Sequence, residues 1–353
     1  MLRSGELFLL LCINWKMMDE REVIHGFLKE ELILFKKYLH QSVQSDNPHI
    51  GEIIDYLFRT NGKQLRPILV LLAAKVCGKV TPETYHGAVT VELLHTASLV
   101  HDDVIDKSDI RRGKGSVNAV FDNTKAVLIG DYLLSSALSE SIKTNSVEII
   151  RAISRIGKKL SEGELDQLWL ANQKIIDEKA YFGVIDKKTA SLISACTFIG
   201  AMTAGAGEEV IRQFARLGRI LGICFQIRDD IFDYYNDDVG KPTGNDIREG
   251  KITLPLIYAL QHAPETVVAT MMQHIERQNY SDKNIGALLH FAKTYGGIDY
   301  AFAKIEAYLG EAQQLIDDLQ LNAEMTLYLR RFLFYFEKRS EEHTSELQSL
   351  GRI

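Results

Sequence analysis

Two aspartate-rich motifs, each at the end of an apolar helical stretch, constrain this sequence more than any other feature. Residues 92–106 carry apolar side chains at helical spacing and end in Asp102, Asp103 and Asp106. On an α-helix, Asp102 and Asp106 lie one turn apart on the same face, and Asp103 is rotated by about 100°. Carboxylates held that close repel each other unless a cation lies between them, and Mg²⁺ prefers oxygen ligands shared with a phosphate. The motif indicates a magnesium-diphosphate site, although a solvated helix end has the same pattern.

A second motif of the same kind makes the solvated-end explanation weaker. Asp229, Asp230 and Asp233 follow the apolar helical run 217–225, and Asp229 and Asp233 again lie one turn apart. If the two helices face each other, their carboxylates form a ring around a diphosphate that we expect to hold two or three Mg²⁺ ions. The expected metal ligands are Asp102, Asp106 and Asp229.

The composition is that of a folded helical protein without nucleic-acid partners. The chain has 353 residues, 46% of them hydrophobic and 25% charged, with six prolines and a net charge of −6. That balance suits one large helical domain and lacks the basic surface of a nucleic-acid-binding protein. The four cysteines form no C-x-x-C pair, and three lie in apolar runs. We expect them to be reduced core residues of a cytoplasmic protein without disulfides or a zinc site.

Both ends of the sequence differ from the rest. The apolar run 7–13 is too short to span a bilayer, and no small-residue cleavage site for a secretory signal follows it. Residues 1–17 are therefore expected to be a non-native or mis-assigned extension, and residues 18–338 a single domain. Residues 339–353 resemble the translation of a sequencing adapter and are expected to be a non-native tail. No segment long enough to cross a membrane is expected.

Basic residues gather at three places between the helical runs. Lys63 and Arg66 stand at the start of the apolar helix 68–77, where free backbone N–H groups favour an anion. Arg111 and Arg112 are adjacent, so their guanidinium groups point in different directions and could serve two neighbouring diphosphates. The third place is a loop rich in glycine and proline, with lysines suited to a lid over a cavity, at residues 240–255.

Together these motifs resemble the trans-prenyltransferase family of polyprenyl diphosphate synthases, in register from about Asn61 to about Leu260. The resemblance implies an all-α, isoprenoid synthase-type bundle. It should contain about ten or more helices around a deep central apolar cavity, with both aspartate motifs at the mouth. It also implies a homodimer.

The resemblance assigns expected roles to individual residues. Those expected to be catalytic are Asp102, Asp103, Asp106, Asp229, Asp230, Asp233 and Lys188. Those expected to bind isopentenyl diphosphate are Lys63, Arg66, His95 and Arg112. Those expected to bind the allylic diphosphate are Arg111, Gln167, Lys188, Thr189, Gln226, Lys241 and Lys251.

The implied reaction is a Mg²⁺-dependent, sequential 1′-4 condensation of isopentenyl diphosphate onto an allylic diphosphate, giving an all-trans product. Product length is expected to depend on Ala97 and Ser98, which lie about 6 Å beneath the first motif. In the family, a bulky aromatic residue at these positions stops growth early, and both residues are small here. The sequence therefore predicts a long-chain product, of the kind that supplies a quinone side chain, released at a membrane surface. Ordinary helix packing would also explain two small residues.

Three other functions stay open. A short-chain synthase making farnesyl or geranylgeranyl diphosphate would share every motif. A terpene cyclase would share the helical scaffold, but it would need no isopentenyl site and would replace the second aspartate motif. A non-catalytic partner subunit would be expected to lose acids or diphosphate-binding bases, and this sequence keeps them.

Overall fold

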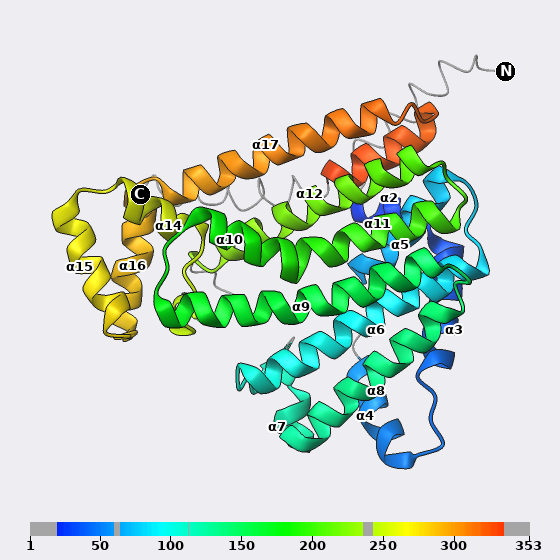
Figure 1. Cartoon of the computed structure of the whole chain (residues 1–353), viewed down its shortest axis with the longest axis horizontal. Helices are drawn as coiled ribbons and strands as arrows, with labels where there is room; N and C mark the ends of the chain where they lie inside the picture. The colour runs from blue at the N-terminus through cyan, green and yellow to red at the C-terminus, as the bar shows by residue number, and fades with distance from the viewer. Residues whose placement is uncertain (1–19, 60–63, 112, 236–242, 335–353) are drawn as a thin grey trace.

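The chain folds into a bundle of long helices (Figure 1), as the apolar periodicity predicts. The computed structural model describes residues 20–59, 64–111, 113–235 and 243–334. The expectations for residues 1–17 and 339–353, and those for Lys63, Arg112 and Lys241, lie outside the described residues. Within the described parts, the strands are one short hairpin, β1 (Ile110–Arg111) and β2 (Lys114–Gly115), in which Ile110 lies opposite Gly115.

The helices differ mainly in length. The long ones are α3 (Lys29–Ser42), α5 (Leu65–Cys77), α6 (Pro82–Ile105), α8 (Asn123–Ile142), α9 (Val147–Gln173), α11 (Ser191–Thr203), α12 (Glu208–Phe232), α16 (Asp282–Thr294) and α17 (Gly297–Asp318). The shorter ones are α2 (Glu20–Phe27), α4 (Pro48–Phe58), α7 (Val117–Phe121), α10 (Glu178–Ile185), α13 (Asn245–Arg248), α14 (Leu254–His262) and α15 (Glu265–Glu276). A π-helical turn, η1 (Asp186–Ala190), joins α10 to α11, and a last helix covers 323–334.

Two buried helices carry the aspartate motifs to their ends. Helix α6 begins with Pro82 after a capping box between Thr81 and Thr84, packs against α5, α8 and α11, and ends beside Asp106. Helix α12 packs between α11 and α17 and ends beside Asp233. Figure 1 shows α9, α11, α12 and α17 running side by side along the bundle. The core therefore fixes the position of both motifs.

One local expectation needs correction, and the turn η1 was not expected. Helices α10 and α11 form one continuous helical run with η1 between them, in which the amide of Ser191 bonds to the carbonyl of Asp186, five residues back. The Gly- and Pro-rich segment 240–255, expected to be loop throughout, contains the short helix α13. Gly296 separates α16 from α17 and has a φ of 73° at the start of α17.

Three of the four cysteines lie within the described residues. Cys77, Cys196 and Cys224 are free thiols, the last two buried, and burial raises the pKa of each to about 12. Over the described ranges, none of the helices has the length and apolar character required to cross a bilayer.

Candidate active site

The three acids of the first motif point in two directions, as helical geometry predicts. Asp103 is 3% exposed and accepts a 2.8 Å hydrogen bond from Nε of Arg111, with a second contact from Nη2. This pair holds the β1–β2 hairpin against the end of α6. Asp102 instead faces Lys188 and Glu164, and Asp106 lies 3.9 Å from Nζ of Lys251.

The electrostatics around Asp102 oppose an ionised carboxylate. Burial raises the pKa of Asp102 to about 6; Lys188 opposes the shift, and Glu164 and Asp106 reinforce it. Acids in the last turn of a helix also oppose the helix dipole, and α6 and α12 both end in them. A cation bound to these carboxylates would offset both the cost of burying their charge and their unfavourable interaction with the helix dipole.

The three acids of the second motif lie in three different environments. Asp230 is buried and accepts hydrogen bonds from the Tyr181 hydroxyl at 2.6 Å and from Nε2 of Gln226 at 2.8 Å. Burial raises the pKa of Asp230 to about 7, and these two hydrogen bonds oppose the shift. Asp233 accepts the backbone N–H groups of Asn245 and Asp246 at 2.9 and 3.0 Å, which fixes the start of α13. Asp229 is exposed.

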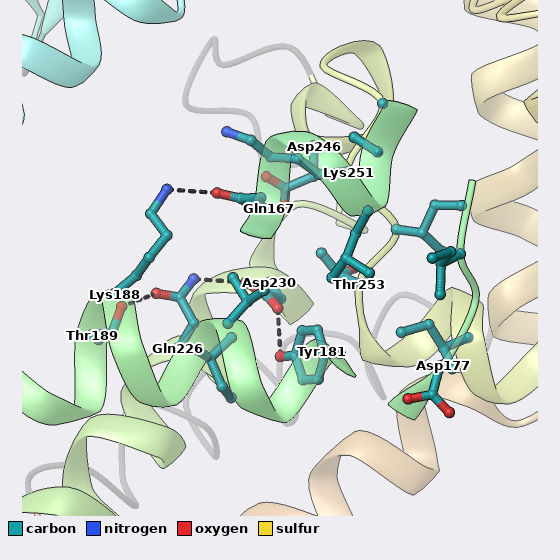
Figure 2. A pocket seen from close by; sticks show the side chains of 18 residues that line it. Gln167, Asp177, Tyr181, Lys188, Thr189, Gln226, Asp230, Asp246, Lys251 and Thr253 are labelled. Carbon is teal, nitrogen blue, oxygen red and sulfur yellow. Dashed lines mark hydrogen bonds between the residues drawn. The ribbon is translucent and has the colours of Figure 1, made fainter. Parts of the chain in front are cut away.

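Four residues expected at the allylic site lie together (Figure 2). Nζ of Lys188 donates to Oε1 of Gln167 at 2.5 Å and also contacts Glu164. The hydroxyl of Thr189 donates to Oε1 of Gln226 at 2.7 Å, and Gln226 in turn donates to Asp230. Adjacent residues of η1 thus reach α9 on one side and α12 on the other.

A cavity of about 170 Å³ lies beside this network. Its polar end includes Lys188, Asp230, Asp246 and Lys251, and Figure 2 shows these side chains around one space. Its apolar wall is formed by residues of α9, α10 and α14 and of the segments that precede α10 and α14. They include Leu170, Ile175, Val184, Ile185, Ile252 and Ile257. Asp102 and Asp106 do not line this cavity, and Lys251 connects it to the first motif.

The residues expected to bind isopentenyl diphosphate are less closely grouped. Arg66 lies in the first turn of α5, as predicted, and His95 is half-buried on α6. A second cavity of about 80 Å³ between α4, α6 and the hairpin is lined by Gln64, Arg111 and Lys114, but not by Arg66 or His95.

Three residues at the site were not predicted from the sequence. Glu164 was assigned no role, yet its side chain is 12% exposed and pairs with Lys188. Tyr181 carried no motif, and Asp246 was noted only as part of a loop. Burial raises the pKa of Asp246 well above its usual value, with Asp230 and Asp233 reinforcing the shift. Tyr181 lies about one helical turn before η1, and its place at the site could be recognised only from the fold.

The donor set fits Mg²⁺ shared with a phosphate better than a metal held by protein alone. Within the described residues, no group of three or more His, Cys, Asp or Glu side chains is arranged to hold a metal ion. The expected ligands Asp102, Asp106 and Asp229 therefore do not form a complete cage by themselves. Mg²⁺ is commonly held by one or two carboxylates, with waters and substrate phosphates completing an octahedron. The carboxylates present suit that arrangement.

Most of the chain matches a known protein family. The sequence model of the polyprenyl synthetase family matches residues 47–292. The chain belongs to the polyprenyl synthetase family. It is similar to heptaprenyl diphosphate synthase component 2 of Geobacillus stearothermophilus, with 33% identity over 90% of this chain and 98% of that protein.

Solved structures of polyprenyl synthetases have the same fold. Geranylgeranyl pyrophosphate synthase from Bacteroides thetaiotaomicron matches with a TM-score of 0.78 and 41% identity, covering 90% of this chain and 99% of that one. A decaprenyl diphosphate synthase from Rhodobacter capsulatus matches with a TM-score of 0.85 and 32% identity, with the same coverage. As a polyprenyl synthetase, this protein is a prenyltransferase with an all-α isoprenoid synthase fold. These relatives make both short and long products, so family membership does not set the product length.

Proposed function

We propose that this protein is an all-trans polyprenyl diphosphate synthase that adds isopentenyl units, one after another, to an allylic diphosphate. The observation that carries the proposal is the arrangement at the ends of α6 and α12. Both aspartate motifs stand there with Lys188 and Lys251 beside them. The carboxylates need cations to balance their charge, and the ammonium groups beside them are held in place. Such an arrangement favours the binding of a diphosphate together with its metal ions.

In the proposed reaction, the protein binds the diphosphate leaving group of the allylic substrate. It also shields from water the allylic cation that forms when the diphosphate leaves. Bound Mg²⁺ would supply positive charge to the diphosphate as its C–O bond ionises. Nζ of Lys188 and the hydroxyl of Thr189 hold the same diphosphate at the polar end of the cavity. The apolar wall, including Leu170 and Ile185, keeps water from the allylic cation. The double bond of isopentenyl diphosphate attacks the cation, and the departing diphosphate accepts the proton that is then lost. No side-chain nucleophile is required.

The remaining substrate contacts are proposed from the family resemblance. Arg111, held by Asp103, faces the allylic diphosphate. Arg66 and His95 bind isopentenyl diphosphate together with Lys63 and Arg112, both outside the described residues.

We propose a long-chain product, for the side chain of a quinone. Ala97 is fully buried on α6, and Ser98 is half-buried with its hydroxyl bonded to the carbonyl of His95 at 2.9 Å. Neither side chain is large enough to close a cavity below the first motif. The alternative is a short-chain product, which the similarity to a geranylgeranyl pyrophosphate synthase keeps open.

We also propose a cytoplasmic homodimer that releases its product at a membrane surface. Helices α8 and α9 expose large apolar side chains, which is unusual for an isolated bundle. They are Val127, Leu128, Leu138, Ile142, Val147, Leu165, Leu168 and Trp169. One relative is named as component 2 of its synthase, so a second, different subunit on this surface is the competing arrangement.

Consumption of isopentenyl diphosphate tests the proposed function. Purified protein is incubated with Mg²⁺, labelled isopentenyl diphosphate and farnesyl diphosphate, and the label is followed into hydrophobic products. Incorporation that disappears in the Asp102→Asn and Asp229→Asn variants supports the proposal. Release of diphosphate from farnesyl diphosphate without incorporation would instead indicate a cyclase. No turnover by the protein alone would favour the partner-subunit function.

A further inference from the structure

The π-helical turn η1 carries both Lys188 and Thr189, so the structures that hold η1 in place decide where these two side chains lie. In a regular helix, adjacent side chains diverge by about 100°. Here Lys188 bonds to Gln167 on α9 and Thr189 bonds to Gln226 on α12. Because η1 contacts both helices, its seat between them sets both hydrogen bonds at once.

Each of the two helices presents a glycine to η1. A Cβ atom added to Gly163 of α9 would lie 2.8 Å from Cγ of Lys188, 2.9 Å from Cβ of Lys187 and 3.2 Å from the backbone N of Lys188. A Cβ atom added to Gly222 of α12 would lie 2.5 Å from Cα of Ala190. Cβ of Lys187, the backbone N of Lys188 and Cα of Ala190 move only with the backbone of η1, so rotating a flexible side chain cannot relieve these contacts.

The two glycines stand in the same relation to the two hydrogen bonds. Gln167 follows Gly163 by one helical turn, and Gln226 follows Gly222 by one helical turn, so each glutamine lies on the same helix face as its glycine. The close approach at the glycine therefore brings η1 to the glutamine one turn further on. Glycine is an unfavourable residue inside a helix, and its position here matches this close approach.

We propose that Gly163 and Gly222 are positioning residues of the allylic diphosphate site: they form a two-sided seat for η1 that aims Lys188 and Thr189 at the diphosphate. This inference rests on the proposed function for its substrate. Any side chain at position 163 would have to push η1 away from α9. The contacts to Cβ of Lys187 and to the backbone N of Lys188 would have to open from 2.9 and 3.2 Å to the 3.4 Å at which ordinary contact begins. The ammonium group of Lys188 would move with η1.

The test compares Gly163→Ala with Gly157→Ala, a matched control. Gly157 lies in the same helix, and a Cβ atom there would meet nothing within 4 Å. We expect Gly163→Ala to raise the KM for farnesyl diphosphate by about tenfold, the loss typical of one misplaced charge-assisted hydrogen bond, and to leave the KM for isopentenyl diphosphate within about twofold. Gly157→Ala should leave both values unchanged. Equal changes in both KM values for Gly163→Ala, or the same effect for Gly157→Ala, would overturn the proposal.

A double-mutant cycle with Lys188→Ala separates positioning from folding. Lys188→Ala removes Cγ, the closest of the three opposing atoms. If Gly163 acts through η1, adding Gly163→Ala to Lys188→Ala raises the KM for farnesyl diphosphate by less than the tenfold expected in the wild-type background, because only Thr189 is then left to be misplaced. Because Lys188→Ala removes the closest opposing atom, the double variant can be compared with Lys188→Ala even if Gly163→Ala alone does not fold. A full tenfold loss in the double variant would refute positioning through Lys188.

A binding measurement keeps this inference distinct from the proposed function. Calorimetric titration of inorganic diphosphate with Mg²⁺ needs no turnover, so it reports on the seat even if the wild-type protein elongates nothing. Weaker binding by Gly163→Ala than by Gly157→Ala supports the seat. Equal binding by the two variants would overturn it, whatever the enzyme assay shows.

Discussion

Replacement of Tyr181 by phenylalanine probes the hydrogen bonding of the second aspartate motif most closely. The change removes one hydroxyl group and little else. That hydroxyl donates to Oδ2 of Asp230 at 2.6 Å, and both side chains are buried. In the variant, Asp230 keeps the hydrogen bond from Gln226 at 2.8 Å. The carboxylate therefore loses one of its two side-chain donors.

The size of the effect depends on pH. A hydrogen bond to a charged group contributes about 2 kcal/mol, and one between neutral groups about 1 kcal/mol. Asp230 has a pKa of about 7, so it is mostly ionised at pH 8 and mostly protonated at pH 6. Tyr181→Phe should therefore lower the free energy of unfolding by about 2 kcal/mol at pH 8 and about 1 kcal/mol at pH 6. The pKa of Asp230 should rise by about one unit.

Urea unfolding of the Mg²⁺-free protein at both pH values measures this difference. Tyr234→Phe is the matched control, because Tyr234 is equally buried but bonds at 2.9 Å to the neutral hydroxyl of Thr253. The control should lose about 1 kcal/mol at both pH values. A loss for Tyr181→Phe that does not change between pH 6 and pH 8 would refute the account of Asp230.

Two further predictions concern the first motif and helix α6. The Mg²⁺-free protein should become less stable as pH rises from about 5 to about 8, because Asp102 and Asp230, with pKa values of about 6 and 7, bind more protons in the folded than in the unfolded state. Asp102→Asn should reduce the pH dependence of the thermal unfolding midpoint in the lower part of this pH range. An unchanged slope of the midpoint against pH would contradict the prediction. Ala97→Phe should shorten the longest product. It should also lower the free energy of unfolding by about 1–3 kcal/mol, because the larger side chain overpacks the core. Unchanged product lengths would favour ordinary helix packing.

The helical architecture could be predicted from the sequence because most helices bury one face. The apolar spacing of residues 92–106 and 217–225 located the ends of α6 and α12, and helix geometry separated Asp102 from Asp103. Lys188 and Thr189 were singled out by the resemblance to the trans-prenyltransferase family and not by helix geometry.

The details of the site depend on contacts between distant segments, which a sequence pattern does not contain. Glu164 has the spacing of a surface acid and becomes buried only because η1 packs on α9. The π-helical turn inserts one residue into a helical run, and the apolar periodicity on either side is too short to reveal it. Helix α13 forms in a segment rich in glycine and proline because Asp233 accepts two of its backbone N–H groups.

The length of the product tests the proposed function most directly. Purified protein is given Mg²⁺, labelled isopentenyl diphosphate and farnesyl diphosphate, and the dephosphorylated products are resolved by chain length. Sequential elongation above the small residues Ala97 and Ser98 predicts a ladder that ends at six or more isoprene units. Arrest at geranylgeranyl length would contradict the long-chain assignment, and the absence of any labelled product would contradict elongation itself.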